Sequence, residues 1–174
     1  MLGVKTVGFG AAAGLSLSLL APVSPAGAVT PSTQATGSAM VLRPVSVAKL
    51  KDMDFGDVTV TAAGTAVLEP NADAFSTTGG VTKVGGTPHS AEFAGSATTS
   101  SIVNIKIPNQ PITLTRVGGA QTMTVSNFTL QGLNKRVIAA QNSFTFRVGG
   151  TLNVAANQVE GVYVGTFTVT VQYP

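Results

Sequence analysis

The sequence predicts an all-β protein, built as an antiparallel β-sandwich. Val, Thr and Gly together fill 66 of the 174 positions, a composition that favours strands and turns over helices. Apolar and polar residues alternate with a period of two in several segments, which is typical of half-buried strands. Glycine-rich and proline-rich stretches separate these segments, as expected for many short strands joined by turns.

Composition also excludes several functional classes. Charged residues make up only 10% of the chain and the net charge is +3, so we expect neither a charge-rich disordered chain nor a nucleic-acid-binding surface. Seven carboxylates and one histidine are too few for a typical hydrolase or metalloenzyme. The absence of cysteine excludes disulfides, thiolate metal sites and cysteine nucleophiles. We therefore expect no enzymatic activity and no cofactor.

The first 28 residues have the features of a secretory signal peptide. Lys5 precedes a stretch of apolar and small residues from Val7 to Ala21, which is shorter than the roughly 20 apolar residues of a membrane helix. The small-x-small triplet Ala26-Gly27-Ala28 follows and predicts cleavage after Ala28. We therefore expect an exported protein without a membrane span in its mature chain; the alternative is an uncleaved anchor.

A small and polar segment follows the predicted cleavage site. Residues 29–43 are poor in charge and contain no clear strand signal, so we interpret them as a flexible arm that precedes one β-sandwich domain over residues 44–174. In an extended arm, alternate side chains share a face. One face carries Ala35, Gly37, Ala39 and Val41, and the other carries Thr36, Ser38, Met40 and Leu42.

The first half of the domain contains a few strand signals separated by turn signals. Alternation over Val58–Thr61 predicts a half-buried strand, which we expect to end in a turn at Ala63-Gly64. Asn71–Ser90 contains two glycine pairs and Pro88, so we expect a loop there. Glu92–Ala94 is a weaker strand candidate.

Strand signals are stronger in the second half. We predict strands over Ile102–Ile107, Ile112–Arg116, Met123–Leu130 and Phe144–Val148. Val137–Gln141 is compatible with a helical turn. A basic-Val-Gly-Gly pattern recurs at Lys83–Gly86, Arg116–Gly119 and Arg147–Gly150, and we interpret it as recurrent turn chemistry, because paired glycines permit the positive φ angles of tight hairpins.

The last strand has the clearest alternation. Phe167, Val169, Val171 and Tyr173 face one way, while Thr166, Thr168, Thr170 and Gln172 face the other. The same alternation in the other strands gives the predicted inner face of the sandwich. It consists of Val58, Val60, Val103, Ile105, Ile107, Phe144, Phe146, Phe167, Val169 and Val171.

Three aspartates form the sequence's best candidate for a metal site. Asp52, Asp54 and Asp57 give the pattern D-x-D-x-x-D, whose oxygen ligands suit a hard cation. The pattern lacks the ligand spacing of an EF-hand loop. On a strand, the first two aspartates would share an exposed face while Met53 and Phe55 pack inward, and we favour this structural interpretation.

The remaining polar candidates also have structural interpretations. His89 is the only histidine, and a single histidine in a polar loop does not make a catalytic triad. Arg116, Arg136 and Arg147 could form a basic patch for acidic sugars or lipopolysaccharide, although solvated charges at the rim are the simpler explanation. Asn127-Phe128-Thr129 is a glycosylation sequon, which would carry little weight if the protein is bacterial.

The C-terminal segment contains a recognisable motif. Gly161 is the fourteenth residue counted back from Pro174, alternating apolar residues follow it, and Tyr173 is penultimate. This pattern resembles the C-terminal motif of chaperone–usher pilin subunits, which have a glycine near that position and a penultimate aromatic residue.

Two further segments carry related resemblances. Val45–Asp57 resembles the opening strand of archaic pilins and spore coat U-type proteins, with Met53 in place of the leucine of their Leu-x-Phe-Gly ending. Gly149–Leu152 and Gly161–Phe167 also resemble a cysteine-free family of exported bacterial β-domains without an assigned function. Many pilins contain a disulfide, from which this cysteine-free chain departs.

The resemblance to pilins implies an immunoglobulin-like sandwich that lacks its last strand. A periplasmic chaperone fills the resulting groove until the N-terminal arm of the next subunit replaces it, through strand addition. The implied donor residues are Ala35, Gly37, Ala39 and Val41. The implied chaperone or subunit interface is Gly161, Phe167, Val169, Val171 and Tyr173.

The resemblance therefore implies a structural subunit of a bacterial surface filament. Its partners would be further copies of itself, a periplasmic chaperone and an outer-membrane usher, and it would pass through the periplasm to the cell surface. The alternative is a monomeric exported β-sandwich that binds glycan or extracellular matrix. The chain has no Trp and only two Tyr, which argues against an aromatic platform for sugars.

Overall fold

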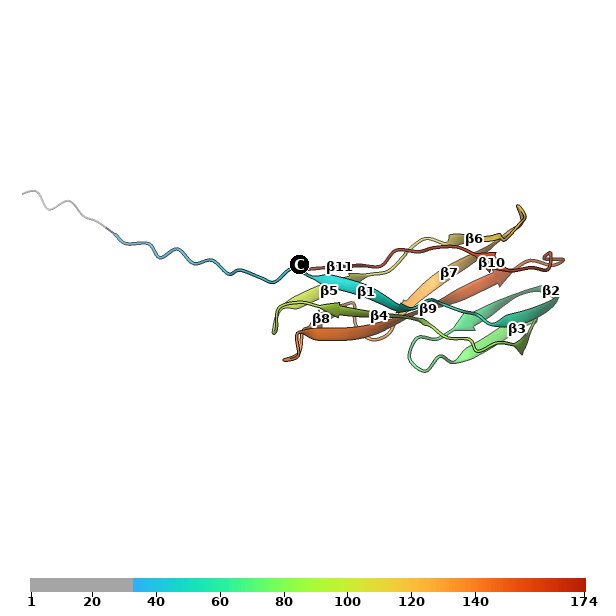
Figure 1. Cartoon of the computed structure of the whole chain (residues 1–174), viewed down its shortest axis with the longest axis horizontal. Helices are drawn as coiled ribbons and strands as arrows, with labels where there is room; N and C mark the ends of the chain where they lie inside the picture. Colours follow the sequence, from blue (N-terminus) through green and yellow to red (C-terminus); the bar gives the residue numbers. More distant parts are fainter. Residues whose placement is uncertain (1–32) are drawn as a thin grey trace, which may run out of the picture. The chain divides into compact units, whose positions relative to one another are not determined.

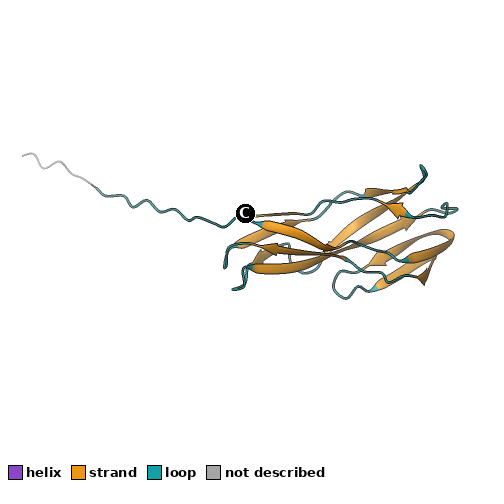
Figure 2. Ribbon diagram, viewed as in Figure 1, coloured by secondary structure: helices purple, strands orange, loops and turns teal. Residues whose placement is uncertain are grey.

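The computed structural model describes residues 33–174, and residues 40–174 form one compact unit. The described residues contain strands and loops and no helix (Figure 2), so the all-β prediction is confirmed. It follows that residues 33–174 hold no helix long and apolar enough to span a membrane. The predicted signal peptide, with Ala26 and Ala28 at its cleavage site, lies outside the described residues.

Eleven strands follow one another in the described residues (Figure 1). They are β1 (Ser46–Lys51), β2 (Asp57–Leu68), β3 (Phe75–Gly85), β4 (Ala91–Ser96), β5 (Ile102–Lys106), β6 (Ile112–Arg116), β7 (Thr122–Leu130), β8 (Lys135–Val137), β9 (Ser143–Val154), β10 (Tyr163–Val164) and β11 (Thr170–Gln172). The hairpin between β6 and β7 turns at Gly118, whose φ is +76°, as its glycine pair predicts.

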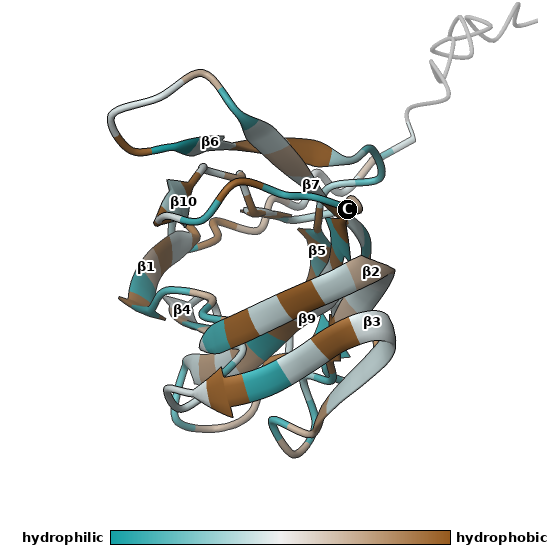
Figure 3. Ribbon diagram, turned by 90° about the vertical axis from the view of Figure 1, so that its right-hand side faces the viewer, coloured by the Kyte–Doolittle hydropathy of each residue, from teal (hydrophilic) through white to brown (hydrophobic). Residues whose placement is uncertain are grey.

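Two antiparallel sheets make up the sandwich. The larger sheet has eight strands, with a path β1-β4-β9-β7-β6-β10 and with β2 bridging β9 to β3. The smaller sheet has the order β11-β5-β8. Figure 3 shows how the larger sheet curls, so that β1 and β10 come to its two ends. Each of these two strands therefore has one unpaired edge, as does β3 at the end of the branch through β2.

Three clusters of buried side chains form the core. The first contains Phe55, Ala66, Leu68, Val81, Val125, Leu152 and Val154. The second contains Ala91, Phe93, Ile105, Phe146 and Val148. The third contains Ala97, Val103 and Ile138. All ten predicted inner-face residues belong to these clusters or pack against them, but only Val103, Ile105 and Phe146 are fully buried.

The prediction of a loop over residues 71–90 was wrong, because this segment contains β3. The chain pairs β3 with β2 along most of its length. The expected turn at Ala63-Gly64 is also absent, since β2 continues through it with an irregular register. The glycine pair in β3 lies opposite this irregular part of β2, where the two backbones approach closely. A Cβ on Gly80 would lie 2.2 Å from the backbone nitrogen of Ala62.

Two other local predictions were wrong for similar reasons. The pair Gly149-Gly150 does not form a turn but lies in the buried part of β9, where a Cβ on Gly149 would lie 2.1 Å from the carbonyl oxygen of Leu68. The glycine is needed because two strands approach closely. Val137 ends the short strand β8 instead of starting a helical turn, because it pairs with Ile102 of β5.

Candidate functional site

The C-terminal segment is an incompletely paired strand. Tyr163 and Val164 pair with β6, and Thr170–Gln172 pair with β5. Between them, Gly165–Val169 makes no backbone hydrogen bond to any described residue. Its side chains nevertheless alternate between half-buried and exposed, as predicted. These five residues therefore have the form of a strand and lack the neighbours of one.

Two glycines allow this segment to lie close to β6. Gly161 has a φ of +144°, and a Cβ there would lie 2.6 Å from Nε of Arg116. A Cβ on Gly165 would lie 2.5 Å from the carbonyl oxygen of Thr113. Gly161 was predicted as an interface residue, and its conformation explains why a glycine stands there.

A loop keeps the middle of the C-terminal segment from pairing on one side. The loop Ile107–Pro111 separates β5 from β6, and its two prolines offer no backbone N–H to a neighbouring strand. A hollow of about 420 Å³ lies between this loop and Thr166–Thr170. The C-terminal segment thus crosses from one sheet to the other beside an open space.

On its other side, the C-terminal segment approaches β1 at β11, and β1 pairs with no strand other than β4. All six residues of β1 are exposed. Val47 and Lys49 lie opposite Gly95 and Phe93 of β4, which face the core, so these two side chains are on the inner face and remain uncovered. We call the region between β1 and the segment Gly165–Tyr173 the open seam.

Lys49 places a charge on the inner face of an edge strand. Its ammonium lies 2.6 Å from Oδ1 of Asp52, and both side chains are exposed, so this ion pair contributes little stability. An inward-pointing charge on an edge strand is a common device against uncontrolled edge-to-edge pairing. Lys49 therefore disfavours uncontrolled pairing at the free edge of β1.

Aromatic side chains form the floor of the open seam. The Phe167 ring lies 5.3 Å from the Phe128 ring and 6.3 Å from the Phe93 ring, between ring centroids. Phe93 is in turn stacked on Phe146 at 5.2 Å. Phe167, Val169 and Val171 pack against this cluster but stay only half-buried. The core beneath the open seam is thus partly accessible to solvent.

Tyr173 closes one end of the open seam. Its hydroxyl donates a hydrogen bond of 2.6 Å to the carbonyl of Arg43 and accepts one of 2.9 Å from the backbone N–H of Thr98. The N–H of Arg43 in turn donates to Oγ1 of Thr98 at 2.7 Å. We call this group the Tyr173 clasp; it ties the C-terminal segment to the residues just before β1.

The predicted donor residues do not take part in any sheet of the described structure. Ala35, Gly37, Ala39 and Val41 are exposed and belong to no strand. No atom of the described chain lies within 4 Å of the position that a Cβ on Gly37 would take. Their role as a donor strand stays a prediction.

The first two aspartates of the D-x-D-x-x-D pattern lie on the exposed side of the chain, and Asp54 stabilises a turn. Met53 and Phe55 pack into the core while Asp52 and Asp54 are exposed, as the structural interpretation predicts. Oδ1 of Asp54 accepts the N–H of Gly56 at 2.7 Å. Within residues 33–174, no group of three or more histidine, aspartate or glutamate side chains is arranged to hold a metal ion.

Sequence reasoning missed a polar network around Asp73. Oδ1 of Asp73 accepts hydrogen bonds from the N–H (2.8 Å) and the hydroxyl (2.5 Å) of the buried Ser90, and Oδ2 lies 3.1 Å from Arg147. Burial raises the pKa of Asp73, but the bonds from Ser90 and the charge of Arg147 outweigh it and hold that pKa below the usual range. The partners lie 17 and 74 positions away, so no local pattern signals them.

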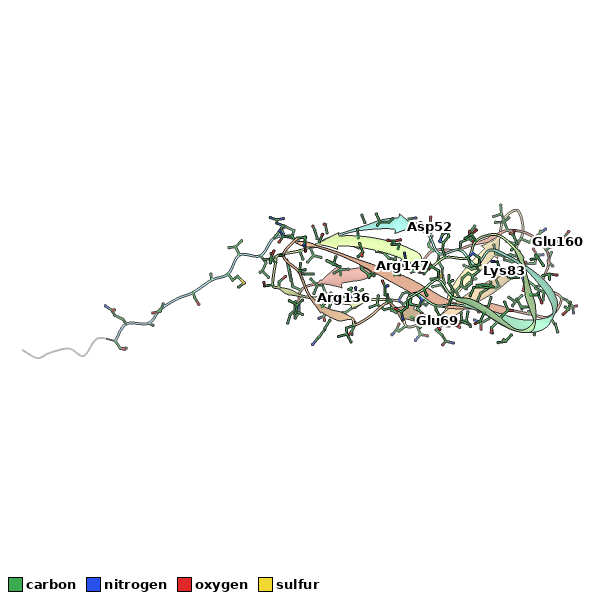
Figure 4. The ribbon with its side chains drawn as sticks, turned by 90° about the horizontal axis from the view of Figure 1, so that it is seen from below. Asp52, Glu69, Lys83, Arg136, Arg147 and Glu160 are labelled. Atoms are coloured by element: carbon green, nitrogen blue, oxygen red, sulfur yellow. The ribbon has the colours of Figure 1, made fainter. Side chains whose placement is uncertain are left out.

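The three candidate arginines do not form a basic patch. Arg116 donates from Nε to the carbonyl of Glu160 at 2.7 Å, and Arg136 donates to three backbone carbonyls. Arg147 is held by Asp73, and lies 3.6 Å from a second carboxylate in β4. Figure 4 shows Arg136 and Glu160 toward different ends of the domain. Each guanidinium is thus used locally.

His89 also has a local structural role. Its backbone N–H and carbonyl pair with Asp54 in an isolated β-bridge, with both hydrogen bonds at 2.9 Å. Its Nδ1 is buried and makes no hydrogen bond to any described residue. The bridge fixes the segment before β2 against the segment before β4, and within residues 33–174 no second histidine accompanies it.

The fold and the open seam define a class: an antiparallel all-β domain with a free strand edge at β1 beside an incompletely paired C-terminal strand. Residues 45–173 match DUF4402, a domain of unknown function, and the chain belongs to this family. The match covers the sandwich and leaves the preceding arm outside it. No curated protein and no solved structure matches the chain.

Proposed function

We propose that this protein is a structural subunit of a bacterial surface filament, completed by a strand from another chain. The observation that carries the proposal is Gly165–Val169, a strand-like stretch without a backbone partner among the described residues. Unpaired backbone N–H and carbonyl groups are strong binding groups, and strand addition to a free edge is a recurrent mode of recognition.

The open seam offers an incoming strand two kinds of interaction. The free backbones of β1 and of Gly165–Val169 supply main-chain hydrogen bonds, which give affinity to any extended segment. The half-exposed side chains of Val47, Phe167 and Val169 supply apolar contacts on the core side. Burying a fully exposed side chain of this kind contributes roughly 1.5–3 kcal/mol. These side chains are already half-buried, so each contributes part of that figure when an incoming strand covers it.

The proposed donor is the arm over residues 29–42 of a second copy. The seam from Gly165 to Gln172 spans about 26 Å at about 3.3 Å per residue, and the arm's 14 residues are long enough to cover it. Its side chains are mostly small, so the backbone ladder supplies most of the affinity. Ala35, Gly37, Ala39 and Val41 would face the core in one register, and a shift by one residue would present the opposite face.

The proposal includes export and two assembly partners. A free edge above a half-exposed aromatic floor is prone to unwanted association, so the subunit needs a partner that covers the seam before assembly. A periplasmic chaperone followed by an outer-membrane usher meets this need. The signal peptide predicted over residues 1–28 would direct the chain to the periplasm, and the filament would then form at the cell surface.

Removal of residues 29–42 tests the proposal. Full-length exported protein is expected to form filaments visible by electron microscopy, and the truncated protein is expected to remain monomeric and to be stabilised by a synthetic peptide of residues 29–42. A peptide carrying Asp at the position of Val41 is the matched control. If the full-length protein stays monomeric and the peptide does not bind, the proposal is wrong; glycan or matrix binding by that monomer would support the alternative function.

A further inference from the structure

The end of the domain opposite the Tyr173 clasp carries a group of exposed valines. We call the end that holds Arg43 and Tyr173 the proximal end, and the end that holds β10 and Glu160 the distal end (Figures 1 and 4). The valine patch at the distal end consists of Val117, Val159, Val162 and Val164, which are 61%, 42%, 67% and 56% exposed.

Backbone hydrogen bonds hold the residues of the valine patch, of which Val164 lies in β10, Val117 in the turn after β6, and Val159 and Val162 in the segment before β10. Val162 and Val164 are two residues apart and therefore share a side of the strand. The N–H of Val117 donates to the carbonyl of Val162 at 2.8 Å, and the Tyr163 hydroxyl donates to the carbonyl of Val159 at 2.6 Å. Clustered exposed apolar side chains of this kind mark an interaction surface.

The Tyr173 clasp determines which end of the open seam can admit a donor. At the proximal end, Tyr173 is bonded to Arg43 and Thr98, so the seam is closed there. A donor strand that is joined to its own domain must therefore leave the seam at the distal end. This requirement places the residue that follows the donor strand, Arg43 of the second copy, beside Val162 and Val164.

We propose that the valine patch docks the proximal end of the second copy whose arm fills the open seam; the proposal rests on the proposed function. The proximal end carries its own exposed apolar pair, Ile102 and Val137, which are directly paired between β5 and β8. The contact is heterologous, because distal residues of one copy meet proximal residues of the next. Repeated contacts of this type build an open filament.

One pair of opposite charges favours the same pairing, although the Arg116 guanidinium also lies at the distal end, where its Nε is 2.7 Å from the carbonyl oxygen of Glu160. Glu160 is exposed at the distal end, and Arg43 is exposed at the proximal end. Neither side chain takes part in an ion pair within residues 33–174. When the two ends meet, a carboxylate of one copy faces a guanidinium of the next, which favours this orientation over one that joins like ends.

Val162→Asp in the full-length protein tests the docking surface. The residue is 67% exposed and outside the core clusters, so the fold and the binding of the arm peptide of residues 29–42 should be unchanged. Polymer formation should fall about tenfold or more, because an unpaired carboxylate would enter an apolar contact. Val84→Asp is the matched control: Val84 is 65% exposed, lies on β3, and should polymerise like the wild type.

Charge reversal provides a second test that does not depend on the valines. Glu160→Arg alone is expected to reduce polymer formation, and Arg43→Glu in the same chain is expected to restore it. The docking surface is refuted if Val162→Asp polymerises like the wild type, if it loses peptide binding as well, or if Val84→Asp is equally impaired. Wild-type protein that neither binds the peptide nor polymerises would refute the proposed function itself, which separates the two failures.

Discussion

Replacing Gly165 with alanine tests the claim that the C-terminal strand depends on a close approach to β6. Gly165 does not have a positive φ, so alanine is allowed there and would stabilise the protein by about 0.4–1 kcal/mol through the unfolded chain. Against this gain, the new Cβ would lie 2.5 Å from the carbonyl oxygen of Thr113 and 2.7 Å from Cδ2 of Leu114. Overpacking of this kind costs about 1–3 kcal/mol.

We expect the steric cost to exceed the gain from the unfolded chain, because the clash can be removed only if the C-terminal strand moves away from β6. The Cβ must move by at least 0.5 Å to reach the 3.0 Å limit of real contacts. This movement of the strand draws the Phe167 ring away from Phe93 and Phe128. We expect Gly165→Ala to lower the free energy of unfolding by about 1–2 kcal/mol, measured by urea titration, and to weaken binding of the arm peptide.

The matched control is Gly37→Ala, since nothing surrounds Gly37 within 4 Å of an added Cβ. This variant should unfold at the same urea concentration as the wild type. A Gly165→Ala protein that is as stable as the wild type would show that the C-terminal strand can lift freely from β6. The close contact would then have no part in shaping the open seam.

Three further substitutions test other parts of the structure. Tyr173→Phe keeps the ring and removes the clasp hydroxyl, so hydrogen exchange at the Thr98 amide should accelerate; unchanged protection in NMR would refute the clasp. Asp73→Asn should lower the free energy of unfolding at pH 7 by about 1–3 kcal/mol. Because the pKa of Asp73 is lowered in the folded state, its stabilising effect is present above about pH 4 and is lost as the pH falls through the folded pKa. The Asn variant should therefore lose less stability between pH 5 and pH 3, and an equal loss in urea titrations would contradict this. Gly149→Ala should prevent folding, since its Cβ would lie 2.1 Å from the carbonyl oxygen of Leu68; soluble, cooperatively unfolding protein would be evidence against it.

The sequence predicts the strands whose side chains alternate, because burial on one face leaves a local pattern. Phe144–Val148 and Met123–Leu130 are examples, since both lie within observed strands, β9 and β7. The alternation in Phe167–Tyr173 is also confirmed residue by residue. Local pattern was sufficient in these segments because their inner faces pack on the core.

Other elements depend on pairing between distant residues, which no local pattern records. The glycine pair in β3 indicates a turn when only the local sequence is considered. In the structure, Gly80 is required because the backbone of Ala62 in β2 leaves no space for a Cβ. The same holds for Gly149 in β9. The break in the C-terminal strand at Gly165–Val169 arises from the loop between β5 and β6, so the strand's own alternation could not reveal it.

The point at which the chain enters the domain, beside the Tyr173 clasp, has a mechanical consequence. The chain joins the domain at Arg43, directly before β1, and β1 is held to β4 by a ladder that runs along the strand from Ser46 to Lys51. Tension applied along the strand at that point loads the rungs of this ladder together, in shear, instead of peeling them one after another. A donor in the open seam would lie alongside the same strand and be loaded in the same way. Survival under such a pull is governed by the rate of forced unfolding, so the domain should resist brief stretching better than its equilibrium stability alone suggests.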